Sequence, residues 1–119
     1  MTEEPGKKSS TGLDENIAGV LCYVLGWLTG IVFLVLEKDS KVVKFHAWQS
    51  IIAFGGLTVL IIALNVMSVI PLIGWIFTIL ASLVGLAGFV LWIILLIKAF
   101  QGGKYKLPYV GNLAEKQAG

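Results

Sequence analysis

The side chains of this chain that could do chemistry gather in one short segment, residues 45–50, with the sequence Phe-His-Ala-Trp-Gln-Ser. On a helix His46 lies one turn from Gln49 and Ser50, so these three polar groups share a face. Glu37 or Asp39 could reach that face across a short polar turn. We therefore expect a polar cluster made of Glu37, His46, Gln49 and Ser50.

Two interpretations of this polar cluster are open. In the first, it is a structural hydrogen-bond network that ties the start of one helix to the end of the preceding helix. In the second, it is a proton- or ligand-sensitive site, because an unperturbed histidine titrates near neutral pH. We favour the structural interpretation.

The remaining residues offer no other chemical constellation. His46 is the single histidine, Cys22 is the single cysteine, and the chain has no arginine. No nucleophile–base pattern, phosphate-binding loop or metal-ligand spacing occurs. We therefore expect no catalytic residue, no metal, no cofactor and no enzymatic activity. With no arginine and a net charge of only +2, nucleic acid is not an expected partner.

The elements that position the cluster are dictated by a long uncharged stretch. Between Lys44 and Lys98 the 119-residue chain has no Asp, Glu, Lys or Arg. As one helix, this stretch of about 50 residues would reach roughly 80 Å. Because a bilayer core is about 30 Å thick, we expect the stretch to cross the membrane twice. Residues 16–36 form another uncharged run, which is long enough for one further span.

These runs predict an all-α fold, a three-span transmembrane helical bundle over residues 13–101. The expected spans are residues 17–36, 46–67 and 72–98. A flexible polar tail is expected over residues 1–12 and a cytoplasmic juxtamembrane tail over residues 102–119. Asp39 or Ser40 suits the N-cap of the second helix, and Gly102-Gly103 suits the end of the third.

Lysine placement predicts the orientation in the membrane. With three spans, the lysines of residues 38–44 and 98–116 share one side, and Lys7 and Lys8 lie on the other. Cytoplasmic loops carry the excess of lysine and arginine. We therefore expect a multi-pass protein of the cell membrane with its N-terminus outside and its C-terminus in the cytoplasm.

Small residues recur at helical spacing in the first and third expected spans. The candidate packing residues are Gly26, Gly30, Gly74, Ala81, Gly85 and Gly88. Small side chains let helix backbones approach closely inside a membrane. We favour packing between helices of one monomer, with an oligomer interface as the alternative.

Several of these segments resemble a family of small prokaryotic membrane proteins of unknown function. The similarity is carried by residues 21–27, 29–31, 36–38, 45–50 and 107–115. The Phe-His-Ala-x-Gln-Ser part is its most specific element. That family is in turn distantly similar to an inner-envelope subunit of the chloroplast protein-import translocon. The resemblance implies a class of protein and no particular mechanism.

The sequence thus favours a non-enzymatic protein that acts through helix packing and contacts with partners. The expected partners are the lipid bilayer and either a second copy or another membrane protein. The alternative is a subunit of an oligomeric pore, transporter or translocon-like assembly.

Overall fold

The computed structural model describes residues 10, 12–102 and 104–118, and every element in that part of the chain is a helix. The expected all-α fold is therefore confirmed. The helices are α1 (Glu15–Val24), α2 (Trp27–Leu36), α3 (Lys41–Met67), α4 (Gly74–Gln101) and α5 (Val110–Ala118). The molecule is elongated, with extents of 55 × 23 × 22 Å.

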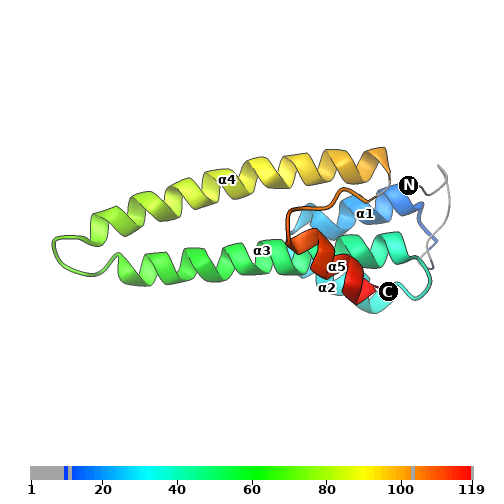
Figure 1. Cartoon of the computed structure of the whole chain (residues 1–119), viewed down its shortest axis with the longest axis horizontal. Coiled ribbons are helices and arrows are strands. Elements are labelled where there is room, and N and C mark those ends of the chain that lie inside the picture. Colours follow the sequence, from blue (N-terminus) through cyan, green and yellow to red (C-terminus); the bar gives the residue numbers. More distant parts are fainter. Residues whose placement is uncertain (1–9, 11, 103, 119) are drawn as a thin grey trace.

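The long axis is an antiparallel hairpin of α3 and α4, which Figure 1 shows running side by side. These are the two described helices that are long and apolar enough to cross a membrane. Their positions agree with the second and third expected spans. Ser40 is the N-cap of α3, and its side chain accepts a hydrogen bond from the N–H of Val43. Gly102, at φ +94°, ends α4.

The first expected span, residues 17–36, is wrong, and with it the three-span bundle. Gly26 interrupts it at φ +64° and ψ −136°, a conformation that is essentially restricted to glycine. The result is two helices, α1 and α2, of 10 residues each. Each is about 15 Å long, half the thickness of a bilayer core. The hydropathy pattern of this run does not reveal that the chain reverses direction within it.

The α1–α2 pair doubles back along α3. At its open end, the side chains of Ser40 and Glu15 are hydrogen-bonded, beside the start of α3. At its tip, the indole N–H of Trp27 donates to the hydroxyl of Thr58 in the middle of α3 (3.2 Å). Consequently α1 runs parallel to α3, and α2 runs back in the opposite direction.

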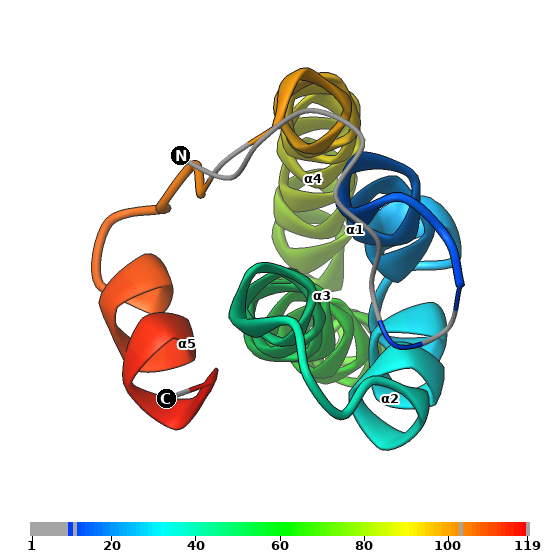
Figure 2. The same cartoon turned by 90° about the vertical axis from the view of Figure 1, so that its right-hand side faces the viewer.

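The first half of α3 is the centre of the fold. Viewed along the long axis, it is flanked by α1, α2, α4 and α5 (Figure 2). Two groups of buried side chains pack here: Ala18, Cys22, Phe33, Val43 and Ala47, and Tyr23, Ala53, Leu95, Ala99 and Leu107. Beyond Leu60, α3 and α4 continue as a two-helix hairpin whose tip is exposed and apolar, with Leu72 92% exposed.

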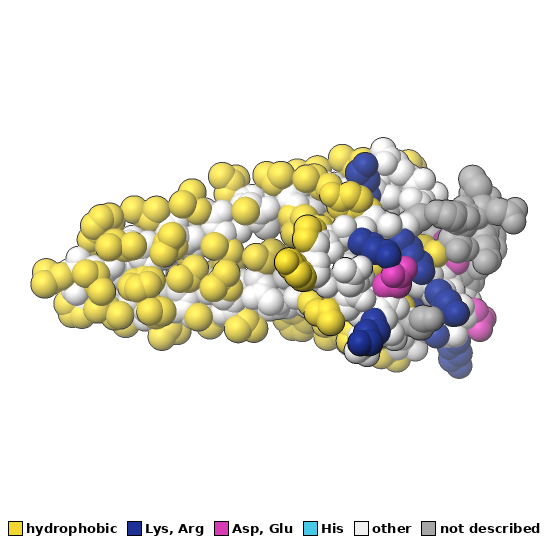
Figure 3. Space-filling model, viewed as in Figure 1, with side chains coloured by type: hydrophobic (Ala, Val, Ile, Leu, Met, Phe, Trp, Pro, Cys, Tyr) yellow, Lys and Arg dark blue, Asp and Glu magenta, His cyan; other side chains and the backbone are white. Residues whose placement is uncertain are grey.

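Both described ends of the chain lie at the same end of the molecule, near Ser10 and α5 (Figure 1). The expectation that the termini lie on opposite sides of a membrane depended on three spans, whereas two of the described helices are long enough to span one. The charged side chains also gather at this end, as Figure 3 shows. Residues 1–9 and 11 of the expected polar tail lie outside the described residues, and the expected C-terminal tail contains α5.

Candidate functional site

Two of the predicted polar residues meet at a tyrosine of α1. The hydroxyl of Tyr23 lies 2.8 Å from Nδ1 of His46 and 2.9 Å from Nε2 of Gln49. All three side chains are almost completely buried. The segment 45–50 therefore contributes a hydrogen-bonded network between α1 and α3.

The amide of Gln49 donates both of its N–H groups in this network. They go to the hydroxyl of Tyr23 and to the carbonyl of Tyr105, the latter at 2.9 Å. The hydroxyl of Tyr23 therefore accepts from Gln49 and shares a second hydrogen bond with Nδ1 of His46, whose direction depends on the tautomer of the imidazole.

Gln49 also holds the segment that follows α4. Its side-chain oxygen accepts a hydrogen bond from the backbone N–H of Leu107 at 2.9 Å. We call Tyr23, His46, Gln49 and the backbone of Tyr105 and Leu107 the clasp, because these groups join α1, α3 and the chain that leads to α5. Both N–H groups of the Gln49 side chain thus have acceptors within the clasp.

Close packing fixes the clasp in place. A Cβ at Gly19 would lie 2.8 Å from the His46 ring, so only glycine lets α1 approach this closely. Trp92 of α4 donates its indole N–H to the carbonyl of Tyr23 at 2.6 Å. The clasp is therefore held from α4 as well as from α1 and α3.

Ser50, the third predicted polar residue, bonds to the turn at Gly26 and is not part of the clasp. Its hydroxyl donates to the carbonyl of Gly26 at 2.9 Å. The hydroxyl of Thr29 accepts from the N–H of Leu25 (3.2 Å) and lies 3.2 Å from the carbonyl of Cys22. The two hydroxyls thus bond backbone groups on both sides of the helix break, and the Gly26 carbonyl also accepts from the N–H of Gly30. Such partners matter most where water is scarce.

Glu37 lies in a separate network at the start of α3. Its Oε2 accepts backbone N–H bonds from Ser10, Asp39 and Ser40 at 2.9, 3.0 and 2.8 Å. Burial alone would raise the pKa of this carboxyl, but the N–H donors stabilise the carboxylate and lower the pKa from 4.5 to about 2. Glu37 therefore organises the α2–α3 turn as a buried anion.

A group of lysines surrounds the chain that leads to α5. Nζ of Lys106 and of Lys104 lie 2.6 and 3.7 Å from the Glu115 carboxylate. The Lys106 hydrogen bond is the largest cause of the lowered pKa of Glu115. Lys98 of α4 lies over the ring of Tyr105, 5.4 Å from its centroid. This group gives the end of the molecule a net positive charge beside the clasp.

The predicted packing residues have different surroundings. A Cβ at Gly30 would lie 3.0 Å from the carbonyl oxygen of Ala47, and one at Gly88 would lie 3.2 Å from Leu57. Gly74 is closed in by the backbone of Ser68, and Ala81 is buried. Nothing lies within 4 Å of a Cβ at Gly85. Gly26 forms the turn described above.

Tyr23 and the backbone of residues 105–107 are parts of the site that were not predicted from the sequence. A tyrosine inside an apolar helix was an available signal, because a buried phenol hydroxyl usually has a hydrogen-bond partner. No sequence pattern indicates that the chain after α4 returns to Gln49.

The fold is that of a small membrane protein with two described helices long and apolar enough to cross a bilayer, and the sequence assigns the chain to a family. Residues 13–114 match the model of the magnetosome magnetite crystal formation protein family, and the chain belongs to this family. No solved structure matches this chain.

The relatives are themselves named as membrane proteins. A UPF0132 membrane protein of Methanocaldococcus jannaschii is 56% identical over 109 residues, covering 92% of this chain and 93% of the relative. A UPF0132 membrane protein of Archaeoglobus fulgidus is 50% identical over 107 residues, covering 90% and 98%. These names identify an uncharacterised group of membrane proteins, as the resemblance noted from the sequence implies.

Proposed function

We propose that this chain is a non-enzymatic membrane protein that acts by packing its exposed hairpin against helices of a second copy or of another membrane protein. The contrast between its two ends supports this proposal. At the charged end, α3 is flanked by four helices, and the clasp joins it to α1 and to the chain that leads to α5. Beyond Leu60, α3 and α4 contact each other and leave their outer faces exposed.

One flank of α4 is suited to close contact with another helix. Thr78 and Ser82 are exposed one turn apart, and Gly85 follows with open space above it. The hydroxyl of Ser82 donates to the carbonyl of Thr78 at 3.0 Å, so its polar group already has a partner. Small residues at such spacing let helix backbones approach each other inside a membrane.

The proposed location is the cell membrane, with the charged end in the cytoplasm. The lysines that flank α3 and α4 lie at this end, which the positive-inside rule places on the cytoplasmic side. In this arrangement α1, α2 and α5 lie in or against the cytoplasmic leaflet, and the apolar tip reaches the opposite interface.

Cross-linking in membranes tests the packing proposal. In a Cys22→Ala background, a cysteine at Ser82 should give cross-linked dimers, or a cross-linked band with another membrane protein. The control is a cysteine at Leu83, which is also exposed but points about 100° away around the helix. Equal cross-linking at the two positions, or none at either, would contradict a specific packing flank.

A second candidate function is a subunit of an oligomeric pore, transporter or translocon-like assembly. The exposed hydroxyl residues Thr78 and Ser82 favour it, because polar side chains from several copies could line a shared path. Two helices enclose no channel, so this function requires an assembly. Flux of ions or a small dye through proteoliposomes, abolished by Ser82→Leu but not by Leu83→Val, would support this candidate over the first.

A further inference from the structure

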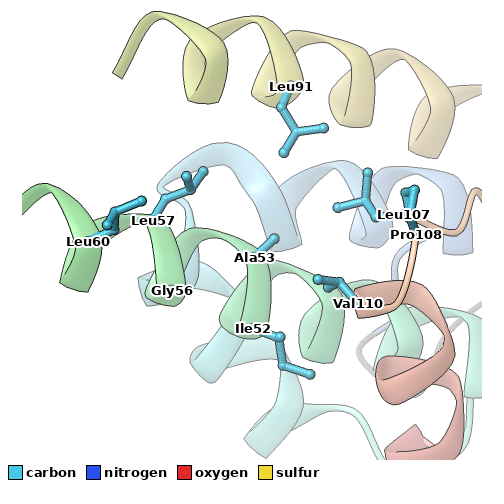
Figure 4. A pocket seen from close by; sticks show the side chains of 9 residues that line it. All are labelled: Ile52, Ala53, Gly56, Leu57, Leu60, Leu91, Leu107, Pro108 and Val110. Carbon is cyan, nitrogen blue, oxygen red and sulfur yellow. The ribbon is translucent and has the colours of Figure 1, made fainter. Parts of the chain in front are cut away.

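An apolar groove lies beside the clasp, between α3, α4 and the chain that leads to α5. Its volume is about 510 Å³, within the size range of small-molecule sites. Figure 4 shows its lining side chains, none of which is polar: Ile52, Ala53, Gly56, Leu57, Leu60, Leu91, Leu107, Pro108 and Val110. The groove is therefore suited to a hydrocarbon ligand.

The clasp builds one wall of this groove. Leu107 is held by its N–H bond to Gln49 and is followed directly by Pro108. Without this wall, the flank of α3 at Ile52 and Gly56 would be an open helix surface. The hydrogen bonds of the clasp thus produce an apolar recess on the outside of the hairpin.

Positive charge lies at the end of the groove nearer the clasp. Lys98 lies two turns after Leu91 on the same flank of α4, about 10 Å along the axis. Lys104 and Lys106 belong to the segment that supplies Leu107 and Pro108. Glu115 is the carboxylate paired with these two lysines, so the three lysines leave an excess of positive charge.

We infer that this groove binds an acyl chain of an acidic phospholipid, whose headgroup lies against Lys98 and the neighbouring lysines. The apolar lining matches the chain, and the lysines match the charge of the headgroup. A packed helix is a poor fit, because a helix is about 10–12 Å across and two turns of it fill roughly 1,000 Å³.

Lipid retention measured by native mass spectrometry tests this inference. The purified protein in mild detergent is titrated with phosphatidylglycerol and, separately, with phosphatidylcholine of the same acyl chains. The wild-type protein should bind one phosphatidylglycerol more tightly than phosphatidylcholine. Gly56→Leu should weaken binding of phosphatidylglycerol by about tenfold or more, which corresponds to about 1.4 kcal/mol. A Cβ at Gly56 has open space around it, so the new side chain fills the groove without a clash at its base.

Val59→Trp is the control, since Val59 is also exposed on α3 but lies outside the groove lining. It should bind lipid as the wild type does, and Lys98→Gln should reduce the preference for phosphatidylglycerol. Leu60→Trp fills the groove from its other end. It is the groove-filling variant to use if Gly56→Leu unfolds at a lower temperature than the wild type. Equal binding by the groove-filling and control variants, or equal binding of the two lipids by the wild type, would overturn the inference.

Discussion

The side-chain oxygen of Gln49 accepts a hydrogen bond from the backbone N–H of Leu107, 58 positions further along the chain, at 2.9 Å. The same amide donates to the hydroxyl of Tyr23 and to the carbonyl of Tyr105. One buried side chain therefore connects α1, α3 and the segment after α4. This connection determines where α5 lies and how the groove is closed.

Replacing Gln49 should release the C-terminal segment. In Gln49→Leu, the buried N–H of Leu107 and the partly buried carbonyl of Tyr105 lose their side-chain partner. The expected loss of stability is about 1–3 kcal/mol, measured as thermal unfolding in detergent, with faster amide exchange in α5. Gln117→Leu, at an exposed position of α5, is the control and should change neither measurement. Unaltered exchange in α5 of Gln49→Leu would contradict the role of the clasp.

Substitution of His46 distinguishes a structural role from a titrating one. His46→Gln retains a donor and an acceptor but loses the titration, so the structural role predicts that it is tolerated. His46→Leu removes one of the two side-chain partners of the Tyr23 hydroxyl and should cost about 1–3 kcal/mol. Thermal stability is compared for both variants and the wild type between pH 5 and 8. A step in the wild-type curve that both variants lack would instead favour a pH-sensitive site.

The Gly26 turn predicts an asymmetry between two glycines. Gly26→Ala places a Cβ at φ +64° and ψ −136° and should destabilise the protein by about 1–3 kcal/mol. Gly56→Ala lies inside α3, with open space around its Cβ, and should stabilise it by up to about 1 kcal/mol. Denaturant unfolding of the two variants measures both effects. Equal stability of Gly26→Ala and wild type would mean that residues 15–36 form a continuous helix.

The low pKa of Glu37 predicts acid sensitivity. Because the folded-state pKa lies below the ordinary value, the stabilisation is complete above about pH 4.5 and is lost as the pH falls towards 2. The loss should be on the order of 2 kcal/mol. Glu37→Gln should be less stable at pH 7 and should lack this part of the acid dependence. Glu115→Gln, which removes an exposed ion pair, is the control and should keep the part of the acid response that comes from Glu37.

The sequence was sufficient to predict the helical class, the long hairpin and its ends. The uncharged stretch required two long apolar helices, and Ser40 and Gly102 are residues whose chemistry favours helix ends. It also identified the segment 45–50, since three polar side chains inside an apolar run need partners. The helical class and the two long apolar helices are confirmed, because both depend on local composition and spacing.

The remaining features depend on contacts between distant residues. The uncharged run over residues 16–36 has the composition of a span, and the conformation of Gly26 decides that it is two short helices. The partner of His46 is Tyr23 on α1, and Gln49 bonds to the backbone of residues 105–107. A backbone group can belong to any residue, so the residue types do not predict which backbone groups Gln49 bonds. The clasp and the groove could therefore be found only from the structure.

Labelling of single cysteines in sealed membrane vesicles tests the two-span arrangement most directly. In a Cys22→Ala background, cysteines replace Ser10 and Gln117 at the charged end and Val69 at the hairpin tip, which are all exposed positions. A membrane-impermeant reagent should reach Ser10 and Gln117 from the same side of the membrane, and any labelling at Val69 should come from the other side. Labelling of Ser10 and Gln117 from opposite sides would show that residues 15–36 cross the membrane and would contradict the two-span structure.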